Sequence, residues 1–283
     1  MGQLGRFGLG YEIASSVGSA DISSEALLSQ LTTQTVGRAI RVVDETTSTI
    51  DEAREWLADG AVDGAVLVAL TQSDGRGRHG RSWASPLGGL WMTILLRPEC
   101  EAKAAGRLGI GMALATAGAV ESETGCRIDL KWPNDLYVGP SKVGGVLVEA
   151  HIQRGRIETA LVSLGLNVNI SLAELPPSVR AVATTLQHAC GHDHDLRRIT
   201  TSIIAGFERM LPAIYSDGEP LATAWKERDA LYGKEVSAHN GGNLLYGRAH
   251  GIDPEGKLVL IADEGNRHFI IAGDVTLTGE IEP

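Results

Sequence analysis

The chain places three arginines on a glycine-rich loop in the segment Gly75-Arg76-Gly77-Arg78-His79-Gly80-Arg81-Ser82-Trp83. Guanidinium groups so close together repel one another unless an anion lies between them. The glycines let such a loop fold closely around a ligand, and the large aromatic ring of Trp83 follows directly. We therefore expect the loop to bind an anion, to be mobile when empty and to become ordered when filled.

The same loop matches the letters of a dinucleotide fingerprint, Gly75-x-Gly77-x-x-Gly80, after a predicted strand over 66–70. That fingerprint requires a helix to begin within the glycines, so that its N-terminus faces the pyrophosphate. Here the chain continues through Ser82–Gly89, which includes Pro86, and no helix is expected. The sequence thus favours a phosphate held by side chains. A solvated basic turn and a weak contact with single-stranded RNA remain alternatives.

Hydrophobic patterns on either side of the loop predict an α+β fold. Strands are expected over 41–43, 65–70, 90–96, 128–131, 143–153 and 157–169, and helices over 24–31, 48–57, 101–124, 196–214 and 221–231. The turn Arg154-Gly155-Arg156 predicts a long antiparallel hairpin. From Gly233 onward, short strands over 235–237, 244–251, 257–262, 268–272 and 275–278 suggest a small appended barrel.

Composition limits the class of protein. With 283 residues, 43% hydrophobic residues and a formal net charge of −10, the chain is expected to fold as one large and one small domain without a general basic face for DNA or an anionic membrane. No apolar run is long enough to cross a bilayer, and no export signal is recognised. The three cysteines, Cys100, Cys126 and Cys190, form no Cys-x-x-Cys pair, so we expect neither a disulfide framework nor a zinc site, and a reducing cytoplasm.

A second group of functional side chains lies in Lys131-Trp132-Pro133-Asn134-Asp135 and in Lys142-Val143-Gly144-Gly145. Proline extends the chain before it, so polar groups gather at the end of a predicted strand. The ammonium of Lys142 precedes two glycines, which would let a ligand approach the backbone. An ordinary surface lysine is the alternative, but the nearby arginine loop favours a site.

Four histidine and cysteine residues with alternate spacing, His188, Cys190, His192 and His194, raise the possibility of a metal site. A solvated loop before the next helix explains them adequately, because Asp193 makes the segment polar. We expect no metal there.

The order of four segments resembles that of the biotin protein ligase family, whose members are biotin–[acetyl-CoA-carboxylase] ligases. These segments are the Ser48-Thr49 helix start, the Gly75–Trp83 loop, the Lys131–Gly145 region and Gly165-Leu166-Asn167-Val168-Asn169. The resemblance spans residues 38–283. It implies a class II synthetase-like catalytic domain with a mixed sheet over 38–232 and an SH3-like C-terminal β-barrel over 233–283. Residues 1–37 would be an extension, in which Gly8–Ile13 looks like the end of a winged domain without its recognition helix.

The resemblance also implies roles for individual residues. Biotin-binding residues would be Ser48, Thr49, Ile50, Gln72, Gly75, Arg76, Gly77, Arg78, Lys142 and Gly145. ATP-binding residues would be Arg78, Arg81, Trp83, Asn134, Lys142 and Asn167, and the catalytic groups Arg76, Arg78, Lys142 and Asp135. Ile50 departs from the family, in which asparagine is frequent, and His79 replaces an arginine of several relatives.

The chemistry implied is ATP-dependent formation of biotinoyl-5′-AMP, with Mg²⁺ bridging the phosphates, and transfer to a lysine of a biotin carboxyl carrier protein. Asp135 would orient or deprotonate that lysine. A lipoate or octanoate transferase and a non-catalytic biotin-responsive regulator are the alternatives. DNA and membrane partners are not expected, whereas exposed strand edges are compatible with a homodimer.

Overall fold

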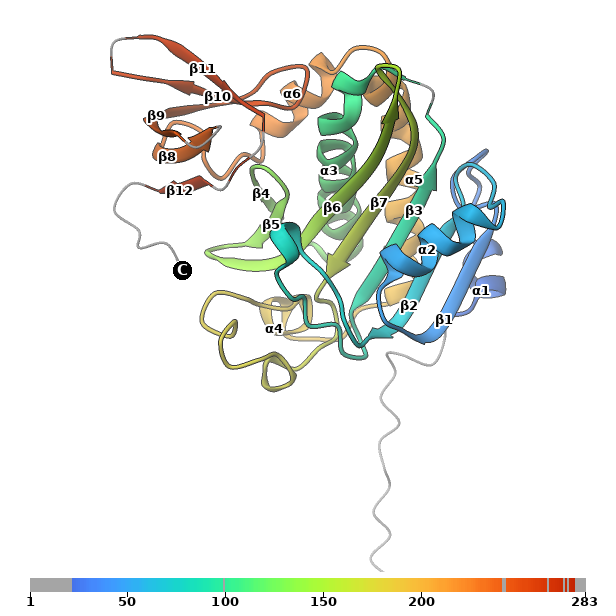
Figure 1. The fold of residues 1–283 in the computed structure, drawn as a ribbon. Helices are drawn as coiled ribbons and strands as arrows, with labels where there is room; N and C mark the ends of the chain where they lie inside the picture. Colours follow the sequence, from blue (N-terminus) through green and yellow to red (C-terminus); the bar gives the residue numbers. More distant parts are fainter. Residues whose placement is uncertain are drawn as a thin grey trace, which may run out of the picture.

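The main body of the protein is a mixed seven-stranded sheet in the computed structural model, which describes residues 22–98, 100–240, 243–263, 265–271, 273 and 275–277. The strand order is β1-β2-β3-β7-β6-β5-β4. The strands are β1 (Ile40–Thr46), β2 (Val66–Gln72), β3 (Leu90–Leu96), β4 (Asp129–Lys131), β5 (Asp135–Val138), β6 (Ser141–Gln153) and β7 (Arg156–Leu166). Helices lie on both faces of this sheet (Figure 1).

The parallel pair of strands, β1 and β2, brings two chain segments to one end of the sheet. Helix α2 (Thr49–Ala58) connects them, since parallel neighbours need a crossover. Thr46 at the end of β1 pairs with Gln72 at the end of β2. The N-terminus of α2 therefore lies beside the start of the glycine-arginine loop.

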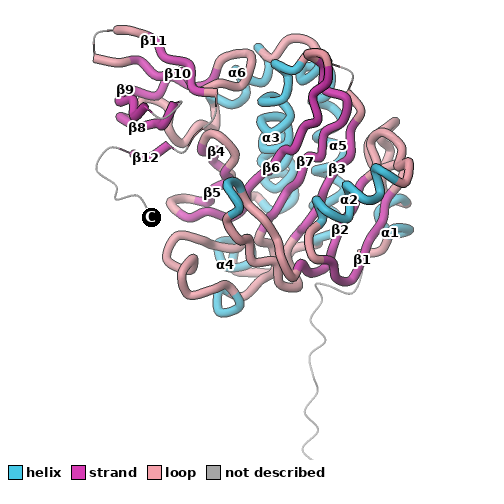
Figure 2. The backbone as a smooth tube through the Cα atoms, viewed as in Figure 1, coloured by secondary structure: helices cyan, strands magenta, loops and turns pink. Residues whose placement is uncertain are grey.

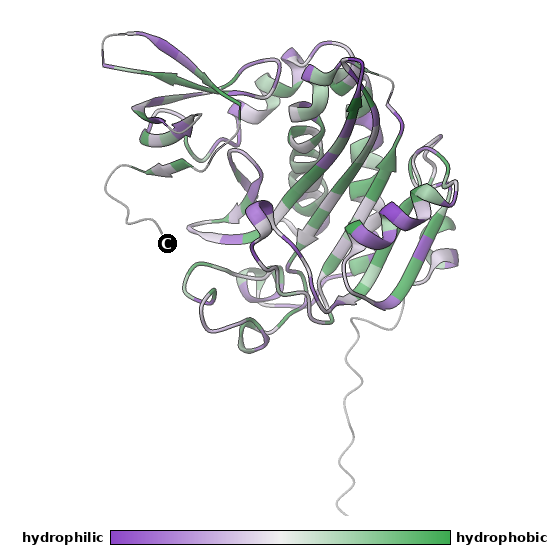
Figure 3. Ribbon diagram, viewed as in Figure 1, coloured by the Kyte–Doolittle hydropathy of each residue, from purple (hydrophilic) through white to green (hydrophobic). Residues whose placement is uncertain are grey.

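The two faces of the sheet are covered by different helices. Val66 and Val68 pack into the core that also contains residues of α3 (Ala105–Thr124) and α5 (Leu196–Tyr215), whereas Leu67 packs with α2. Strands buried on both faces read as nearly continuous apolar runs, which is visible along the sheet in Figure 3. The prediction of strands over 65–70 and 90–96 is confirmed on this basis.

The long hairpin predicted around Arg154-Gly155 is formed by β6 and β7. Both turn residues have positive φ, 51° and 77°, which the right-handed twist of a two-residue hairpin favours. The hairpin runs the length of the main body, so its turn and the opposite ends of its strands lie in different regions of the protein.

The C-terminal part forms a separate antiparallel sheet with the order β11-β10-β9-β8-β12. Its strands are β8 (Glu235–Asn240), β9 (Asn243–Ile252), β10 (Leu258–Ile261), β11 (Arg267–Ile270) and β12 (Val275–Leu277). Helix α6 (Glu219–Lys226) precedes it. The short strands predicted from Gly233 onward are confirmed. The Trp132 indole donates to the Gly256 carbonyl over 2.9 Å and so connects this part to the main body.

The chain before β1 contributes to the main body where it is described. Helix α1 (Ser24–Leu28) is capped by Ser23, whose hydroxyl accepts the N–H of Ala26. The helix starts where the sequence predicts and ends at Leu28, three residues earlier than predicted. Leu27 and Val36 are fully buried in the main core. The predicted boundary at 37/38 therefore falls within this body, and the Gly8–Ile13 segment lies outside the described residues.

The expectation that the cysteines stay unpaired is wrong for two of them. Cys126, just after α3, forms a disulfide with Cys190 at the end of α4 (Leu186–Cys190), whereas Cys100 is buried and free. The two paired residues are 64 positions apart, so their proximity depends on the tertiary fold and has no local signature.

Three short 3₁₀ turns complete the described elements: η1 (Arg78–Gly80), η2 (Ala102–Ala104) and η3 (Leu172–Glu174). Within the described part of the chain, no helix combines the length and the apolar character needed to cross a membrane.

Candidate active site

The loop between β2 and β3 folds back on itself through backbone hydrogen bonds. The N–H of Trp83 donates to the Gly75 carbonyl, and the N–H of Gly77 donates to the Arg81 carbonyl, both over 2.7 Å. A Cβ at position 75 would lie 2.5 Å from the Trp83 carbonyl oxygen, so glycine is required there. All residues of this loop are described, and they contain one 3₁₀ turn, η1, but no α-helix (Figure 2). The loop therefore lacks the helix N-terminus of a dinucleotide site.

Arg76 forms a bidentate ion pair with Asp51 in the first turn of α2. Each terminal nitrogen lies 2.6 Å from one carboxylate oxygen. The Arg76 guanidinium thereby holds the pKa of Asp51 below its usual range. The sequence predicts that Arg76 faces an anionic ligand, but here a carboxylate of the protein neutralises it. The sequence pattern did not identify Asp51 as this partner.

Arg78 connects the loop to two other parts of the molecule. Its Nη1 donates to Asn134 Oδ1 over 3.3 Å, and its Nη2 donates to the Gly273 carbonyl over 3.2 Å. Asn134 is itself fixed, because its Nδ2 donates to the Val146 carbonyl over 2.8 Å. The guanidinium is thus placed at the tight turn between β4 and β5.

Lys142, at the start of β6, lies at the same turn. Its Nζ is 2.6 Å from Asp135 Oδ1 and 5.3 Å from the centre of the Trp83 ring. The Lys142 and Asp135 side chains remain 29% and 23% exposed, so both can be reached from solvent. An ammonium, a carboxylate and an indole from three separate segments therefore meet.

The Trp83 ring lies over a glycine surface on the hairpin. A Cβ at Gly165 would be 2.7 Å from Trp83 Nε1, and a Cβ at Gly144 would be 2.8 Å from the Gly165 carbonyl oxygen. Gly145 pairs with Gly165, but a Cβ there would make only ordinary contacts, the nearest at 3.7 Å. Two of the three glycines are therefore required by packing, while position 145 would tolerate a small side chain in contact with Lys142 and Asp135.

A chain of polar groups fixes the start of α2. The Thr49 N–H donates to Gln72 Oε1 over 2.8 Å, and Gln72 Nε2 donates to Ser85 Oγ over 2.7 Å. Both ends of the Gln72 amide are thus bonded within the protein. Ser48 is 1% exposed and its hydroxyl does not cap the helix. Ile50 packs with Leu67 in the apolar cluster under α2, away from this polar chain.

Two buried hydroxyls that sequence reasoning missed extend the polar chain. Thr93 Oγ1 lies 2.9 Å from Thr49 Oγ1 and 2.8 Å from Ser163 Oγ. Thr93 and Ser163 face each other across the register of β3 and β7. Thr93 is the one hydroxyl in the otherwise apolar β3, which is the signal that could have revealed it. Ser163 has no such signal, because β7 also contains Thr159 and Glu158.

Other predicted site residues lie at the margin. Asn167 is 4% exposed; its Nδ2 donates to the Thr184 carbonyl over 3.0 Å, while its buried Oδ1 has no partner among the described residues. Arg81 is exposed on the loop, and a Cβ at Gly77 would meet only an ordinary contact at 3.5 Å. Asn167 is therefore positioned by the segment that leads into α4.

The histidine-rich segment forms no metal centre within the described residues, where no group of three or more His, Cys, Asp or Glu side chains could hold an ion. The rings of His192 and His194 lie 4.5 Å apart. Burial lowers the pKa of His194, which favours its neutral form.

Comparison with known families and proteins gives consistent matches. Residues 40–169 match the Biotin/lipoate A/B protein ligase family, and residues 232–277 match the biotin protein ligase C-terminal domain. The bifunctional ligase/repressor BirA of Bacillus subtilis is 30% identical over 270 residues, covering 95% of this chain and 82% of that protein. The biotin–[acetyl-CoA-carboxylase] ligase of Paracoccus denitrificans is 33% identical over 240 residues, covering 83% of this chain and 98% of that protein.

A similar solved structure has the same architecture. The biotin protein ligase of Aquifex aeolicus, solved in complex with biotin and ATP, superposes with a TM-score of 0.74 at 29% identity. The match covers 85% of this chain and 98% of that one.

Proposed function

The chain belongs to the biotin protein ligase family, and we propose that it joins biotin to ATP as biotinoyl-5′-AMP and passes the biotinoyl group to a lysine of a biotin carboxyl carrier protein. The observation that carries this proposal is the meeting of Lys142, Asp135 and Trp83 beside the guanidinium of Arg78. The similar structure that holds biotin and ATP supports both substrates.

The first step brings two anions together. A carboxylate oxygen of biotin attacks the α-phosphorus of ATP, and the bond to the pyrophosphate oxygen breaks. Lys142 contacts Asp135, and Arg78 contacts the preceding residue, Asn134. The two cations are therefore close enough together to screen the charge on the reacting phosphate. This is positioning and electrostatic stabilisation, with no covalent bond to the enzyme.

The second step transfers the acyl group. The amine of the acceptor lysine attacks the carbonyl of the mixed anhydride, AMP leaves, and the amine loses a proton. Asp135 is the carboxylate at the centre of the site, and its Oδ1 lies 2.6 Å from Lys142 Nζ. We assign Asp135 to orienting the amine and accepting its proton.

The start of α2 would supply the polar contacts to biotin. Ser48 and Thr49 offer hydroxyls beside the end of β2 for the ureido group, while Gln72 holds the Thr49 backbone in place. Since Ile50 lies in the apolar cluster, we assign it to support of α2 rather than to a polar contact. Gly75, Gly77 and Gly145 would line the path of the ligand.

The nucleotide would lie on the other side of Lys142. The Trp83 ring would stack on adenine, and Asn134 and Asn167 would offer amides to the nucleotide. Arg81, exposed on the loop, would meet the phosphates. Arg76 can join them only by leaving Asp51, so we infer that ligand binding competes with this ion pair.

Mg²⁺ is assigned to the phosphates rather than to a protein site. The described residues provide no cluster of three ligating side chains, and the carboxylate of Asp135 is already paired with Lys142. Phosphate oxygens and water suit Mg²⁺, which would neutralise part of their charge when bound.

The decisive experiment is incubation with biotin, ATP, Mg²⁺ and an acceptor domain, read by acceptor mass. We expect one biotinoyl group per acceptor, and no addition when lipoate or octanoate replaces biotin. Pyrophosphate release without the acceptor separates an enzyme from a non-catalytic regulator; its absence would contradict the proposal.

A lysine variant tests the site itself. Lys142→Met should slow adenylate formation by about 10²-fold, equivalent to about 3 kcal/mol, the scale of losing one donor that stabilises transition-state charge. Lys226→Met is the matched control, since Lys226 also lies near an aromatic ring, 4.7 Å from the centre of Tyr232, but belongs to α6 and to none of the site segments. Equal rates in the two variants would remove Lys142 from the mechanism.

A further inference from the structure

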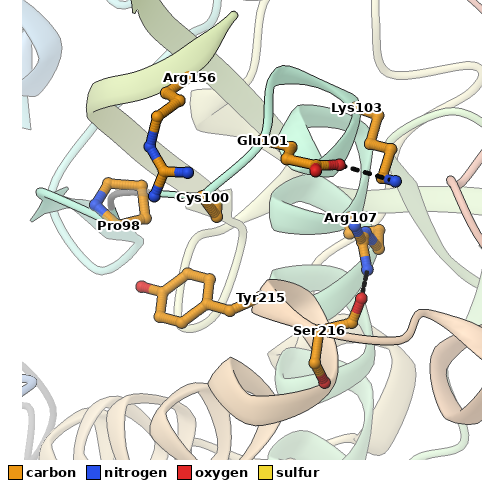
Figure 4. A pocket seen from close by; sticks show the side chains of 8 residues that line it. All are labelled: Pro98, Cys100, Glu101, Lys103, Arg107, Arg156, Tyr215 and Ser216. Atoms are coloured by element: carbon orange, nitrogen blue, oxygen red, sulfur yellow. Dashed lines mark hydrogen bonds and ion pairs between the residues drawn. The ribbon is translucent and has the colours of Figure 1, made fainter.

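A cavity of about 380 Å³ lies at the start of α3, next to the turn of the β6–β7 hairpin. Figure 4 shows the side chains that surround it, among them Arg156 from the hairpin, Lys103 and Arg107 from the α3 region and Tyr215 from the end of α5. Arg156 is nine residues along β7 from Gly165, which is roughly 30 Å of extended strand. The cavity is therefore remote from the candidate active site.

The lining of this cavity is positively charged in a chain with a formal net charge of −10. Three cations, Lys103, Arg107 and Arg156, face one carboxylate, Glu101, which forms an ion pair of 2.7 Å with Lys103. The N-terminus of α3, a helix of 20 residues, adds the positive end of its dipole. An excess of positive charge therefore remains after the internal ion pair is formed.

Arg107 carries the strongest indication of a ligand. Its residue is only 3% exposed, and no carboxylate of the described residues lies within ion-pair distance of it. Its Nη1 donates to the Ser216 carbonyl over 2.9 Å, but its buried Nε has no partner in the described part of the chain. A buried guanidinium is costly unless its donors and its charge are satisfied. An oxyanion in the cavity would balance the charge of this group.

The size and walls of the cavity indicate what accompanies the anion. Inorganic phosphate would fill only part of it, since one water occupies about 30 Å³ and small-molecule sites begin near 300 Å³. The Tyr215 ring and Pro98 provide a flat, apolar wall beside the cations. An aromatic or similarly flat organic group fits between them.

We propose that this cavity, lined by Lys103, Arg107, Arg156, Tyr215 and Pro98, binds a small molecule that carries a phosphate group and a flat organic part. The phosphate contacts the guanidinium groups of Arg107 and Arg156, and the organic part lies against Tyr215. The site is separate from the proposed biotin and ATP sites and does not depend on their assignment.

The test uses phenyl phosphate as the probe, titrated into the purified protein by calorimetry, with inorganic phosphate and phenol as partial probes. We expect one phenyl phosphate per chain, bound at least fivefold more tightly than either partial probe. Arg156→Gln should weaken binding at least fivefold, whereas Glu101→Gln should strengthen it by removing the opposing charge. The matched control is Arg154→Gln, since Arg154 is exposed in the same turn and does not line the cavity. The affinity of this variant for phenyl phosphate should differ less than twofold from that of the unmodified protein.

Two further measurements identify the location. The NMR signal of the Arg107 Nε–H should shift during the titration, and Lys142→Met should leave binding unchanged. Absence of binding, equal weakening by Arg156→Gln and Arg154→Gln, an unmoved Arg107 signal, or loss of binding in Lys142→Met would each overturn the proposal.

Discussion

At the scale of single residues, the ion pair between Asp135 and Lys142 separates the two half-reactions. Asp135→Asn keeps the shape of the side chain and leaves the Lys142 ammonium without its carboxylate at 2.6 Å. We expect adenylate formation to be retained and transfer to the acceptor lysine to slow by at least tenfold, because general-base assistance is lost. Pyrophosphate release and acceptor mass, followed separately by rapid quench, check this; full transfer rates would exclude the role.

The residues of the site could be predicted only as far as their chemistry was local. Arg78, Lys142 and Trp83 stood out because charge and aromaticity are unusual on a glycine loop or before a double glycine. Asp51 could not be identified as the ion-pair partner of Arg76, since the pairing depends on how α2 lies over the sheet. The buried hydroxyls of Thr93 and Ser163 likewise gain meaning only from strand register.

At the scale of elements, Arg78 connects the β2–β3 loop to the rest of the proposed active site. Arg78→Gly removes its hydrogen bonds to Asn134 and to the Gly273 carbonyl. The reactive anhydride should then leave the site more easily, because a loop that closes over an intermediate retains it and excludes water. We expect biotinoyl-5′-AMP to be released at least tenfold faster, as measured by chasing the radiolabelled intermediate. We also expect biotin to become attached to unrelated lysines.

The control for this variant changes the same loop without touching those contacts. His79 is exposed and has a φ of 57°, where glycine is unstrained, so His79→Gly should retain the intermediate as the unmodified protein does. Equal release rates in Arg78→Gly and the unmodified protein would show that Arg78 does not keep the β2–β3 loop closed over the intermediate.

Helix α5 fixes the segment before β1 through one carboxylate. Glu208 accepts the N–H groups of Gln34, Thr35 and Val36, at distances between 2.6 and 3.0 Å. Burial acts to raise the pKa of Glu208, but the three N–H donors outweigh it and the pKa is lowered. Glu208→Gln should reduce the free energy of unfolding by about 1–3 kcal/mol at neutral pH, the cost of weakened hydrogen bonds to a charged group.

The pH dependence gives this prediction its sign. A carboxyl with a lowered folded pKa stabilises the protein above its unfolded pKa of about 4.3, and this contribution is lost as the pH falls through the folded value. Urea titrations should therefore show the Glu208→Gln difference at pH 7 and a smaller one in acid. Glu227→Gln, in an exposed position after α6, serves as the control.

The elements themselves were the most predictable level of the structure. Burial on both faces makes β2 and β3 nearly continuous apolar runs, and Arg154-Gly155 specifies the hairpin turn, so these elements follow from local sequence. The parallel pairing of β1 with β2 and the Cys126–Cys190 disulfide do not, because each joins segments whose contact is created by the packing of helices.

At the scale of the whole molecule, the two sheets are connected at places that matter for the site. Trp132, which precedes the Asn134 turn, donates to Gly256 of the C-terminal sheet, and Arg78 donates to the carbonyl of Gly273. The C-terminal sheet therefore contributes to positioning the proposed catalytic loop, and its orientation should affect activity as well as stability.

The junction between the sheets contains a carboxyl in an unfavourable position, and its titration gives a prediction for the whole molecule. Asp229 lies where residues 228–230 hydrogen-bond to Leu130 of β4, just before the chain enters β8. Its Oδ1 accepts the Leu231 N–H over 2.8 Å, but its buried Oδ2 has no partner among the described residues. Burial raises the pKa of Asp229 to about 6.

Because the folded protein holds this proton more tightly than the unfolded chain, whose aspartates have a pKa of about 3.9, the charged form opposes folding. The penalty is fully present above pH 6 and is relieved as the pH falls toward the unfolded value. Asp229→Asn removes the charge while retaining the acceptor, so its free energy of unfolding relative to the unmodified protein should rise by about 2 kcal/mol between about pH 4.5 and 7.5. Chemical denaturation at both pH values measures this, with the exposed Asp59→Asn as the control. A difference that does not change with pH would mean that the carboxylate at this junction is solvated and that the two sheets meet there without an electrostatic cost.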